Sequence, residues 1–110
     1  QTLIEKTFNK FYSNFMYDTY KSILDKYLNL TGLEIMDFKI KPMKSALGKC
    51  SKEKRAIFLS SSLIHKEIPF IEAVVMHEVA HLKYSNHQKE FYDYINKYMS
   101  DYKNRMKKYL

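Results

Sequence analysis

Apolar residues recur every three or four positions from Ile4 to Leu28, which is the spacing of one helix face. This pattern predicts an amphipathic α-helix of about seven turns, and its many aromatic residues are interpreted as core. Thr2 followed by Glu5 has the pattern of a capping box at the start of the helix. Gly32 comes after the last apolar turn and is expected to end the helix in the left-handed backbone conformation.

The spacing of apolar residues then changes to two, which is typical of a strand with one buried face. Within residues 34–41, Met36, Phe38 and Ile40 alternate with charged residues, and Pro42 ends the segment. We therefore expect a half-buried strand that carries these three apolar side chains on its inner face.

Two further segments, separated by a polar turn, predict a hairpin over residues 43–60. The first strand candidate, residues 43–50, is the weaker one, and Gly48 within it indicates a bulge or a close backbone approach. The second is the short apolar strand 56–59. A serine run follows it and is expected to cap a short helical turn that ends at His65.

Helical spacing returns in the second half of the chain. Residues 69–84 are apolar nearly all round, which is typical of a buried helix, and Pro69 occupies the expected first helical position. A break at residues 85–86 precedes a helix that begins at residue 87 or 88, and a short helix over 101–110 follows. This order of a long helix, a small three-stranded sheet, an apolar helix and C-terminal helices predicts an α+β fold.

Length and composition are those of one globular domain, with 110 residues that are 45% apolar and 15% aromatic. No apolar run is long enough to span a membrane. The single cysteine, Cys50, excludes an intrachain disulfide and suits a reducing compartment such as the cytoplasm. The net charge of +7 favours acidic partners, including nucleic acid. Because basic residues are spread along the whole chain, we interpret them as a solvated surface.

The apolar helix over residues 69–84 carries the pattern His-Glu-x-x-His at His77, Glu78 and His81, and His87 follows six residues later. Histidines four residues apart lie on the same helix face, so both imidazoles can reach one metal ion. Glu78 leans toward the same face, where it can take a proton from a water molecule. Two histidines and an acid in a buried helix need partners, and a metal ion supplies them.

Two imidazoles without a cysteine pair favour a catalytic Zn²⁺ site, which has three protein ligands and one open position. His87 is the first candidate for the third ligand, because the chain must fold back after the helix break. Glu90 lies one turn beyond His87 and is an alternative ligand or an outer acceptor for an imidazole N–H. If the third ligand were an acid farther along the chain, it would have to be Asp93 or Asp101. His65 is interpreted as a surface or turn histidine and not as a metal ligand.

The chemistry of such a site is hydrolysis, since zinc lowers the pKa of a bound water to about 7 and polarises a carbonyl. With Glu78 as general base, the zinc-activated water is expected to cleave peptide bonds in a peptide or protein substrate. The hydroxyls of Tyr84, Tyr92 and Tyr94 are candidates for stabilising the oxyanion, and the sequence does not choose among them. An extended peptide is expected to add to the strand over residues 56–59.

Four segments resemble the YgjP-like metallopeptidase family, in the family's order. Residues 77–92, HEVAHLKYSNHQKEFY, resemble its signature H-E-[LV]-x-H-L-x-x-x-N-H-S-x-x-F-W. Residues 43–51, MKSALGKCS, resemble its M-K-S-R-W-G-S-C-S, and residues 56–64 resemble its G-x-I-x-L-N-x-x-L-I. Asp101 and Tyr102 resemble the end of its P-D-Y motif. A more distant likeness is to the SprT-like zinc proteases.

The resemblance implies a compact zincin-like fold in which a small sheet shields the active-site helix. It implies a zinc site of His77, His81 and His87 with Glu78 as base, in a single metallopeptidase domain over residues 1–110. Family members usually carry a further β-rich region before this domain, so the chain is expected to be a fragment or a minimal version.

The chain departs from the family pattern where the substrate cleft is expected. Ala46 and Leu47 stand where the family has Arg and Trp, Lys49 replaces a serine, and Gln88 follows His87 in place of another serine. The positions of the metal ligands and of the general base are kept. The resemblance therefore implies the chemistry of this chain more directly than it implies the substrate.

Two other functions stay open at this point. Zinc with a general base can also hydrolyse nucleoside triphosphates, which relatives in this family are linked to, although the chain has no glycine-rich loop to hold phosphates. The basic surface also allows a nucleic-acid-associated domain, although no recognised nucleic-acid motif is present. Salt-dependent binding would separate the second of these from catalysis.

Overall fold

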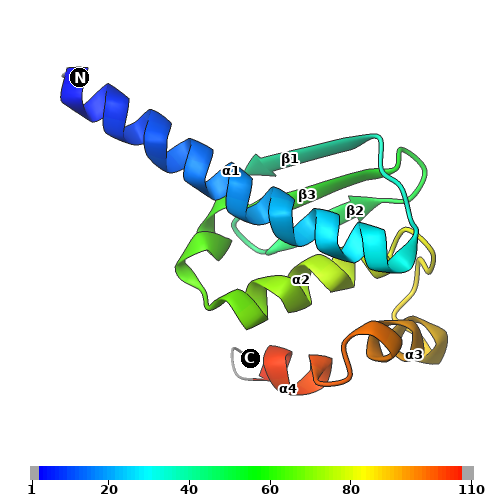
Figure 1. The fold of residues 1–110 in the computed structure, drawn as a ribbon. Helices are drawn as coiled ribbons and strands as arrows, with labels where there is room; N and C mark the ends of the chain where they lie inside the picture. Colours follow the sequence, from blue (N-terminus) through cyan, green and yellow to red (C-terminus); the bar gives the residue numbers. More distant parts are fainter. Residues whose placement is uncertain (1–2, 108–110) are drawn as a thin grey trace.

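The structure is a computed structural model that describes residues 3–107, with side chains from residue 10 onward. In chain order its elements are α1 (Leu3–Thr31), β1 (Asp37–Lys41), β2 (Gly48–Ser51), β3 (Ala56–Ser60), the 3₁₀ turn η1 (Ser61–His65), α2 (Ile68–Ala80), α3 (Lys89–Tyr98) and α4 (Tyr102–Lys107). The α+β class and the order of elements predicted from the sequence are confirmed (Figure 1). The predicted capping box at Thr2 and Glu5, and the predicted helix end at residues 108–110, lie outside the part that the structure describes.

The three strands form one sheet in the order β1-β3-β2. β2 and β3 pair in an antiparallel register, which confirms the predicted hairpin, and β1 pairs with β3 in parallel. β3 is therefore bonded along both sides. The expectation that a peptide adds to residues 56–59 is wrong, because no backbone edge of β3 is free; β1 and β2 are the edge strands.

β1 is shorter than predicted and begins at Asp37 rather than at residue 34. Phe38 and Ile40 are half-buried as expected, whereas Met36 is 83% exposed. The reason is the length of the partner strand. Asp37 pairs with Ala56, the first residue of β3, so residue 36 has no strand residue opposite it and points into solvent.

α2 is the centre of the fold and contacts α1, α3, α4, β2 and β3. In Figure 1 it lies in the middle of the molecule, with α1 and the sheet on one side and α3 and α4 on the other. This explains why it is apolar nearly all round, since it has neighbours in every direction. It begins at Ile68, one residue before the prediction, and ends four residues before it, at Ala80. After Ala80, the amides of Leu82 and Lys83 donate to the carbonyls three residues earlier, a pattern that is typical of a helix terminus.

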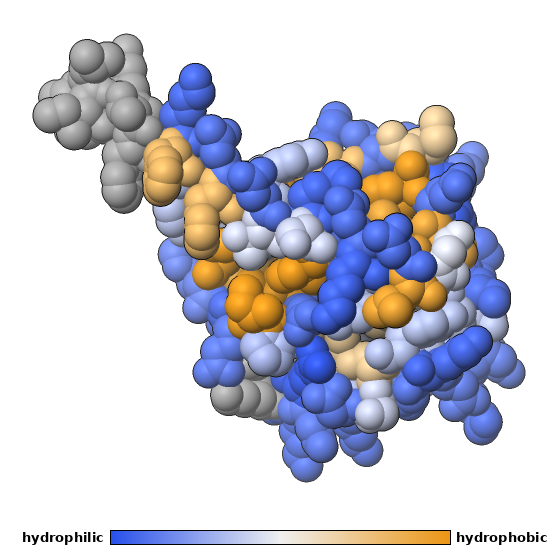
Figure 2. All heavy atoms as spheres, in the orientation of Figure 1, coloured by the Kyte–Doolittle hydropathy of each residue, from blue (hydrophilic) through white to orange (hydrophobic). Residues whose placement is uncertain are grey.

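Among the α1 side chains that the structure describes, from residue 10 onward, the buried ones lie in the second half of the helix. Tyr20, Leu24 and Tyr27 are buried, and Gly32 ends the helix with φ +74°, as predicted. Phe11 and Phe15, which were interpreted as core, are 72% and 55% exposed. The beginning of α1 projects beyond the sheet (Figure 1), and apolar surface lies open along it (Figure 2). Of the helices in residues 3–107, none combines the length and the apolar character that crossing a bilayer requires.

Candidate metal centre

The end of α2 brings His77, Glu78 and His81 to one side of the helix, beside strand β2. His81 is the residue that follows α2, and its amide still bonds to the His77 carbonyl at 3.3 Å, so the helical spacing extends to it. The two imidazole ring centres are 4.9 Å apart. The predicted common face of the pattern therefore exists.

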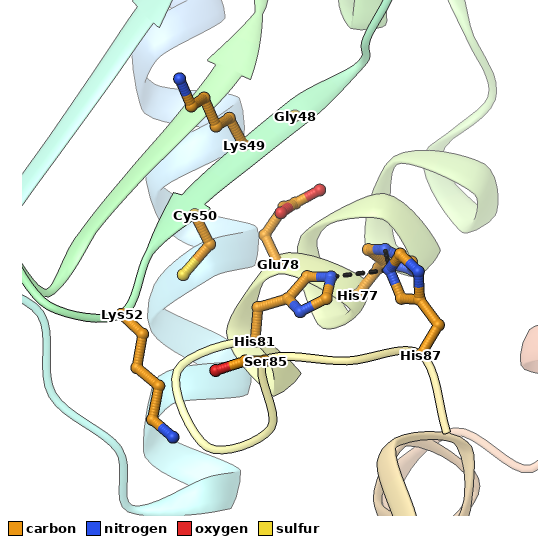
Figure 3. Close-up of a pocket in the computed structure, with 9 residues that line it drawn as sticks. All are labelled: Gly48, Lys49, Cys50, Lys52, His77, Glu78, His81, Ser85 and His87. Atoms are coloured by element: carbon orange, nitrogen blue, oxygen red, sulfur yellow. Dashed lines mark hydrogen bonds between the residues drawn. The ribbon is translucent and has the colours of Figure 1, made fainter. Parts of the chain in front are cut away.

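His87 joins these two histidines from the loop that leads to α3. Its Nε2 lies 2.9 Å from Nε2 of His81 and 3.2 Å from Nε2 of His77 (Figure 3). The three rings offer nitrogen atoms that all lie within 4.8 Å of one another. Among the described residues, this is the group of histidine, cysteine and acidic side chains that could hold a metal ion.

Two basic side chains from the β2–β3 turn hold the loop that carries His87. Arg55 Nη1 donates to the Leu82 carbonyl at 2.9 Å, and Lys52 Nζ donates to the Lys83 carbonyl at 3.1 Å. Arg55 has a positive φ of 52°, and its Nε and Nη2 also donate to the carbonyl of Glu34. The sequence placed both residues in a polar turn with no further role, because their partners are backbone atoms distant along the chain.

Two of the three separations between the histidine nitrogens are close to those of a tetrahedral metal site. Zn–N distances of about 2.0–2.1 Å in a tetrahedral site place two ligand nitrogens about 3.3 Å apart, and the observed separations are 2.9 and 3.2 Å. His81 Nδ1 lies 3.0 Å from the Tyr84 carbonyl, which can only accept, so this nitrogen carries the proton and Nε2 keeps its lone pair. Burial and the neighbouring imidazoles lower the pKa of His77 to about 4, which keeps that ring in the neutral form that binds metals.

The outer nitrogen of each α2 histidine has a partner. For His81 it is the Tyr84 carbonyl, and for His77 it is the hydroxyl of Tyr102 in α4, 2.7 Å from Nδ1. Phe91 of α3 is fully buried and lies against all three imidazoles, with ring centres 4.6 to 5.0 Å away. Neither Tyr102 nor Phe91 was among the predicted site residues. The likeness of Asp101 and Tyr102 to a family motif was the one sequence signal in this segment, but it did not predict the contact between Tyr102 and His77.

Glu78 is the only acidic side chain that is buried among the described residues, with 7% of its surface exposed. Burial raises the pKa of its carboxyl group to about 7. It lies against the backbone of Gly48 in β2. A Cβ atom at Gly48 would sit 2.9 Å from Cγ and from Oε2 of Glu78, which is closer than side chains tolerate. The close backbone approach predicted at Gly48 is therefore confirmed, and its neighbour is the Glu78 carboxyl group.

These groups line a pocket of about 410 Å³, which we call the histidine pocket. Its walls come from β2, the turn after it, α2 and the loop before α3 (Figure 3). Besides the three histidines and Glu78, it is lined by Gly48, Lys49, Cys50, Lys52 and Ser85. Burial, with the charge of Glu78, raises the pKa of the Cys50 thiol to about 11, so this wall of the pocket is a protonated thiol at neutral pH.

The remaining predicted residues lie elsewhere. Glu90 is exposed and lines a different hollow beside Lys83 and Tyr84. Asp93 and Asp101 are exposed: Asp93 pairs with Lys89 of the same helix, α3, and Asp101, which precedes α4, pairs with Arg105. His65 is exposed at the end of η1.

Of the three tyrosines considered for the oxyanion, none is among the residues that line the histidine pocket. Tyr84 contributes its carbonyl to His81 rather than its hydroxyl, and its ring packs against Tyr94 at 5.6 Å. Tyr92 is 39% exposed, with its ring centre 6.4 Å from that of His87.

An α+β fold that gathers three histidines and a buried carboxyl group in one pocket has the parts of a metal-dependent hydrolase. A model of the family described as YgjP-like, metallopeptidase domain, matches residues 1–109. The chain belongs to this family and is a metallopeptidase.

Two solved structures share the fold, and both are metallopeptidase zymogens: abylysin of Pyrococcus abyssi and jannalysin of Methanocaldococcus jannaschii. Each is 21% identical to this chain, with a TM-score of 0.71. Both matches cover 81% of this chain. They cover 90% of the abylysin chain and 85% of the jannalysin chain. No curated protein matches the chain. The two zymogens therefore share this arrangement of helices and sheet.

Proposed function

We propose that residues 1–110 form one zinc-dependent peptidase domain. In this proposal His77, His81 and His87 bind the zinc ion, and Glu78 is the general base. The observation that carries it is the meeting of three imidazole Nε2 atoms, at 2.9 and 3.2 Å, in the same pocket as a buried carboxyl group. The substrate is a peptide or protein, as the metallopeptidase family requires.

When bound, zinc would supply a Lewis acid that activates a water molecule and polarises the substrate carbonyl. The residues of the chain then move the protons. Glu78 accepts a proton from the attacking water and returns it to the leaving amine, so that the peptide bond breaks with no net change on the carboxyl group. A carboxyl group whose burial brings its pKa to about 7 can do both near neutral pH. Tyr102 holds His77, and the Tyr84 carbonyl holds His81.

The substrate path that fits this site follows the outer edge of β2. This strand has β3 on one side only, and Gly48, Lys49 and Cys50 within it line the histidine pocket. A peptide that added to this edge would bond to the strand backbone and place its carbonyl groups beside Glu78. This edge replaces the strand over residues 56–59 that the sequence suggested.

We also propose that the enzyme works in the cytoplasm. The chain has one cysteine, Cys50, and therefore no intrachain disulfide that an oxidising compartment would maintain. Its half-buried thiol, with a pKa raised to about 11, is protected from becoming a reactive thiolate. Fractionation of cells that express the tagged protein would test this assignment.

The test of the proposed function combines metal analysis with hydrolysis. The purified chain is expected to hold one zinc per molecule and to cleave a denatured protein, with activity lost on chelation and recovered when zinc is added back. Glu78→Gln should keep the zinc and lose hydrolysis by about 10²–10⁴-fold, the contribution of a positioned general base. Activity that survives this substitution, or a protein that binds no zinc, contradicts the proposal.

The same preparations separate the other candidate functions. Nucleoside triphosphates assayed under identical conditions should yield no pyrophosphate or phosphate above the level of the Glu78→Gln protein. Binding to nucleic acid that falls steeply with salt, with no peptide hydrolysis at all, would instead favour the nucleic-acid-associated domain.

A further inference from the structure

A second cavity adjoins the histidine pocket on the other side of Glu78. It has a volume of about 270 Å³ and shares Gly48, His77 and Glu78 with the histidine pocket. Its remaining walls are Leu47, Val74, Met106 and Ser45. We call it the apolar pocket. Because the two cavities meet at Glu78, whatever enters the apolar pocket lies next to the group that moves the protons.

Three elements build the apolar walls. Leu47 leads into β2, Val74 lies one helical turn before Glu78 on α2, and Met106 comes from α4. Val74 is only 3% exposed, and Leu47 and Met106 are half-buried and pack against the hydrophobic core. All three walls therefore rest on the core, and the unbranched Met106 side chain can adapt to different shapes.

The chemistry of these walls selects apolar side chains. No lysine or arginine lines the cavity and its one acid is Glu78, so an acidic side chain of a substrate would lose its hydration without gaining a partner. The volume is also sufficient, since an apolar cavity of about 150 Å³ can accommodate benzene. Leucine, methionine and phenylalanine side chains fit both criteria, and glycine would leave the walls without contacts.

A peptide on the edge of β2 would pass both cavities, because Gly48 in this strand lines each of them. Successive side chains of an extended peptide point in opposite directions. A peptide with a carbonyl group beside Glu78 would therefore bring a neighbouring side chain within reach of the apolar pocket, which would then receive a residue directly next to the bond that is cut.

We propose that the apolar pocket, through Leu47, Val74 and Met106, sets the sequence preference of the peptidase, which cleaves next to a leucine, methionine or phenylalanine. This inference rests on the proposed peptidase function and adds the class of substrate. Leu47 stands where the resembling family motif has Trp, so this chain has a smaller residue at the wall that decides how much room the pocket offers.

The test first locates a cleaved bond by mass spectrometry of a digested denatured protein. A peptide series then varies each residue beside that bond among glycine, alanine, leucine, methionine, phenylalanine, lysine and glutamate. At one of the two positions, kcat/KM for leucine should exceed that for glycine and for glutamate by at least about tenfold. Met106→Ala should shift the preference toward phenylalanine, and Leu47→Trp should shift it toward alanine. Met36→Ala, at an exposed methionine that does not line the pocket, is the matched control and should change neither.

Binding provides a second readout that does not need turnover. Fluorescent peptides from the same series are titrated into the Glu78→Gln protein, where tighter binding of the leucine peptide should disappear with the added Leu47→Trp change. Hydrolysis with equal rates across the series overturns the apolar pocket and leaves the peptidase function intact. A binding preference that Leu47→Trp removes, with no hydrolysis by the unaltered protein, supports the pocket and overturns the proposed chemistry. No preference in either readout overturns the pocket.

Discussion

The two cavities beside Glu78 share a wall but differ in how the chain builds them. The proposed metal ligands of the histidine pocket, His77, His81 and His87, lie within eleven residues of one another along the chain. The apolar pocket takes its walls from Leu47, Val74 and Met106, which are spread over 60 positions. The difference teaches that the groups proposed to react are encoded locally, whereas the proposed substrate preference depends on how distant elements pack. Four further predictions test how far the proposed chemistry depends on residues that are near in the sequence and on residues that are distant.

Loss of a proposed metal ligand should have the largest effect on the histidine pocket. His87→Ala removes the loop nitrogen that lies 2.9 Å from His81. Loss of a residue that hydrogen-bonds to a metal ligand lowers metal affinity by roughly 10–100-fold. Loss of the ligand itself should lower the affinity further, and the rate of hydrolysis should fall with it. Because His87 is exposed, the fold should survive, which circular dichroism checks. His65→Ala, at an exposed histidine of η1, serves as the control; equal metal binding by both variants would exclude His87 as a ligand.

Gly48→Ala tests the shared wall. The added Cβ would meet Cγ and Oε2 of Glu78 at 2.9 Å, so the carboxyl group must move. Since a misplacement of about 1 Å can cost about 10²-fold in rate, kcat should fall up to that far while zinc content stays unchanged. A parallel Ala substitution at exposed Ser100 should leave kcat as it was. Full activity of Gly48→Ala would show that the position of Glu78 does not depend on this contact.

Tyr102→Phe tests a distant residue that acts on the histidine pocket. It removes the hydroxyl that lies 2.7 Å from His77 Nδ1 but keeps the buried ring. Zinc affinity should fall by about 10–100-fold, and competition with a metal chelator of known affinity measures it. Tyr98→Phe, on a half-buried tyrosine of α3 that pairs with Tyr94, should leave the affinity unchanged. If both variants bind zinc equally well, Tyr102 only fills space.

The smallest expected effect is on the stability of the metal-free protein. Burial raises the pKa of Glu78 to about 7 from an ordinary value of 4.5. The stability that belongs to the protonated carboxyl is therefore complete below pH 4.5 and is lost as the pH rises through 7. The lowered pKa of His77 acts in the opposite sense, with stability lost as the pH falls from 6.5 through about 4.

Glu78→Gln isolates the carboxyl contribution, because glutamine does not titrate. Relative to this variant, the unaltered metal-free protein should lose on the order of 1–3 kcal/mol of unfolding free energy between pH 4.5 and pH 7. Urea denaturation across this range, in the presence of a chelator, measures the difference. Parallel curves for the two proteins would mean that Glu78 keeps an ordinary pKa in the folded chain.

Much of the fold follows from periodicity in the sequence. The change from helical spacing to alternation located β1, the polar turn located the hairpin, and Gly32 ended α1 as its type predicts. The errors lie where an element extends past its neighbours. Met36 alternates correctly but has no strand residue opposite it, and Phe11 continues an apolar stripe where α1 has left the core. A local pattern records which face is apolar, but not whether another element covers it.

The sequence by itself determined which residues are proposed to carry the chemistry. Four-residue spacing on a helix places His77 and His81 on one face whatever surrounds them, and Glu78 comes with them. Only the tertiary structure decided the rest: that His87 returns to within 3.2 Å of His77, that Tyr102 holds that ring, and that Met106 closes a cavity against Leu47. The physical reason is that helix geometry is set by bonds between near neighbours. Loops and cavity walls depend on packing and hydrogen bonds between residues that are far apart in the chain.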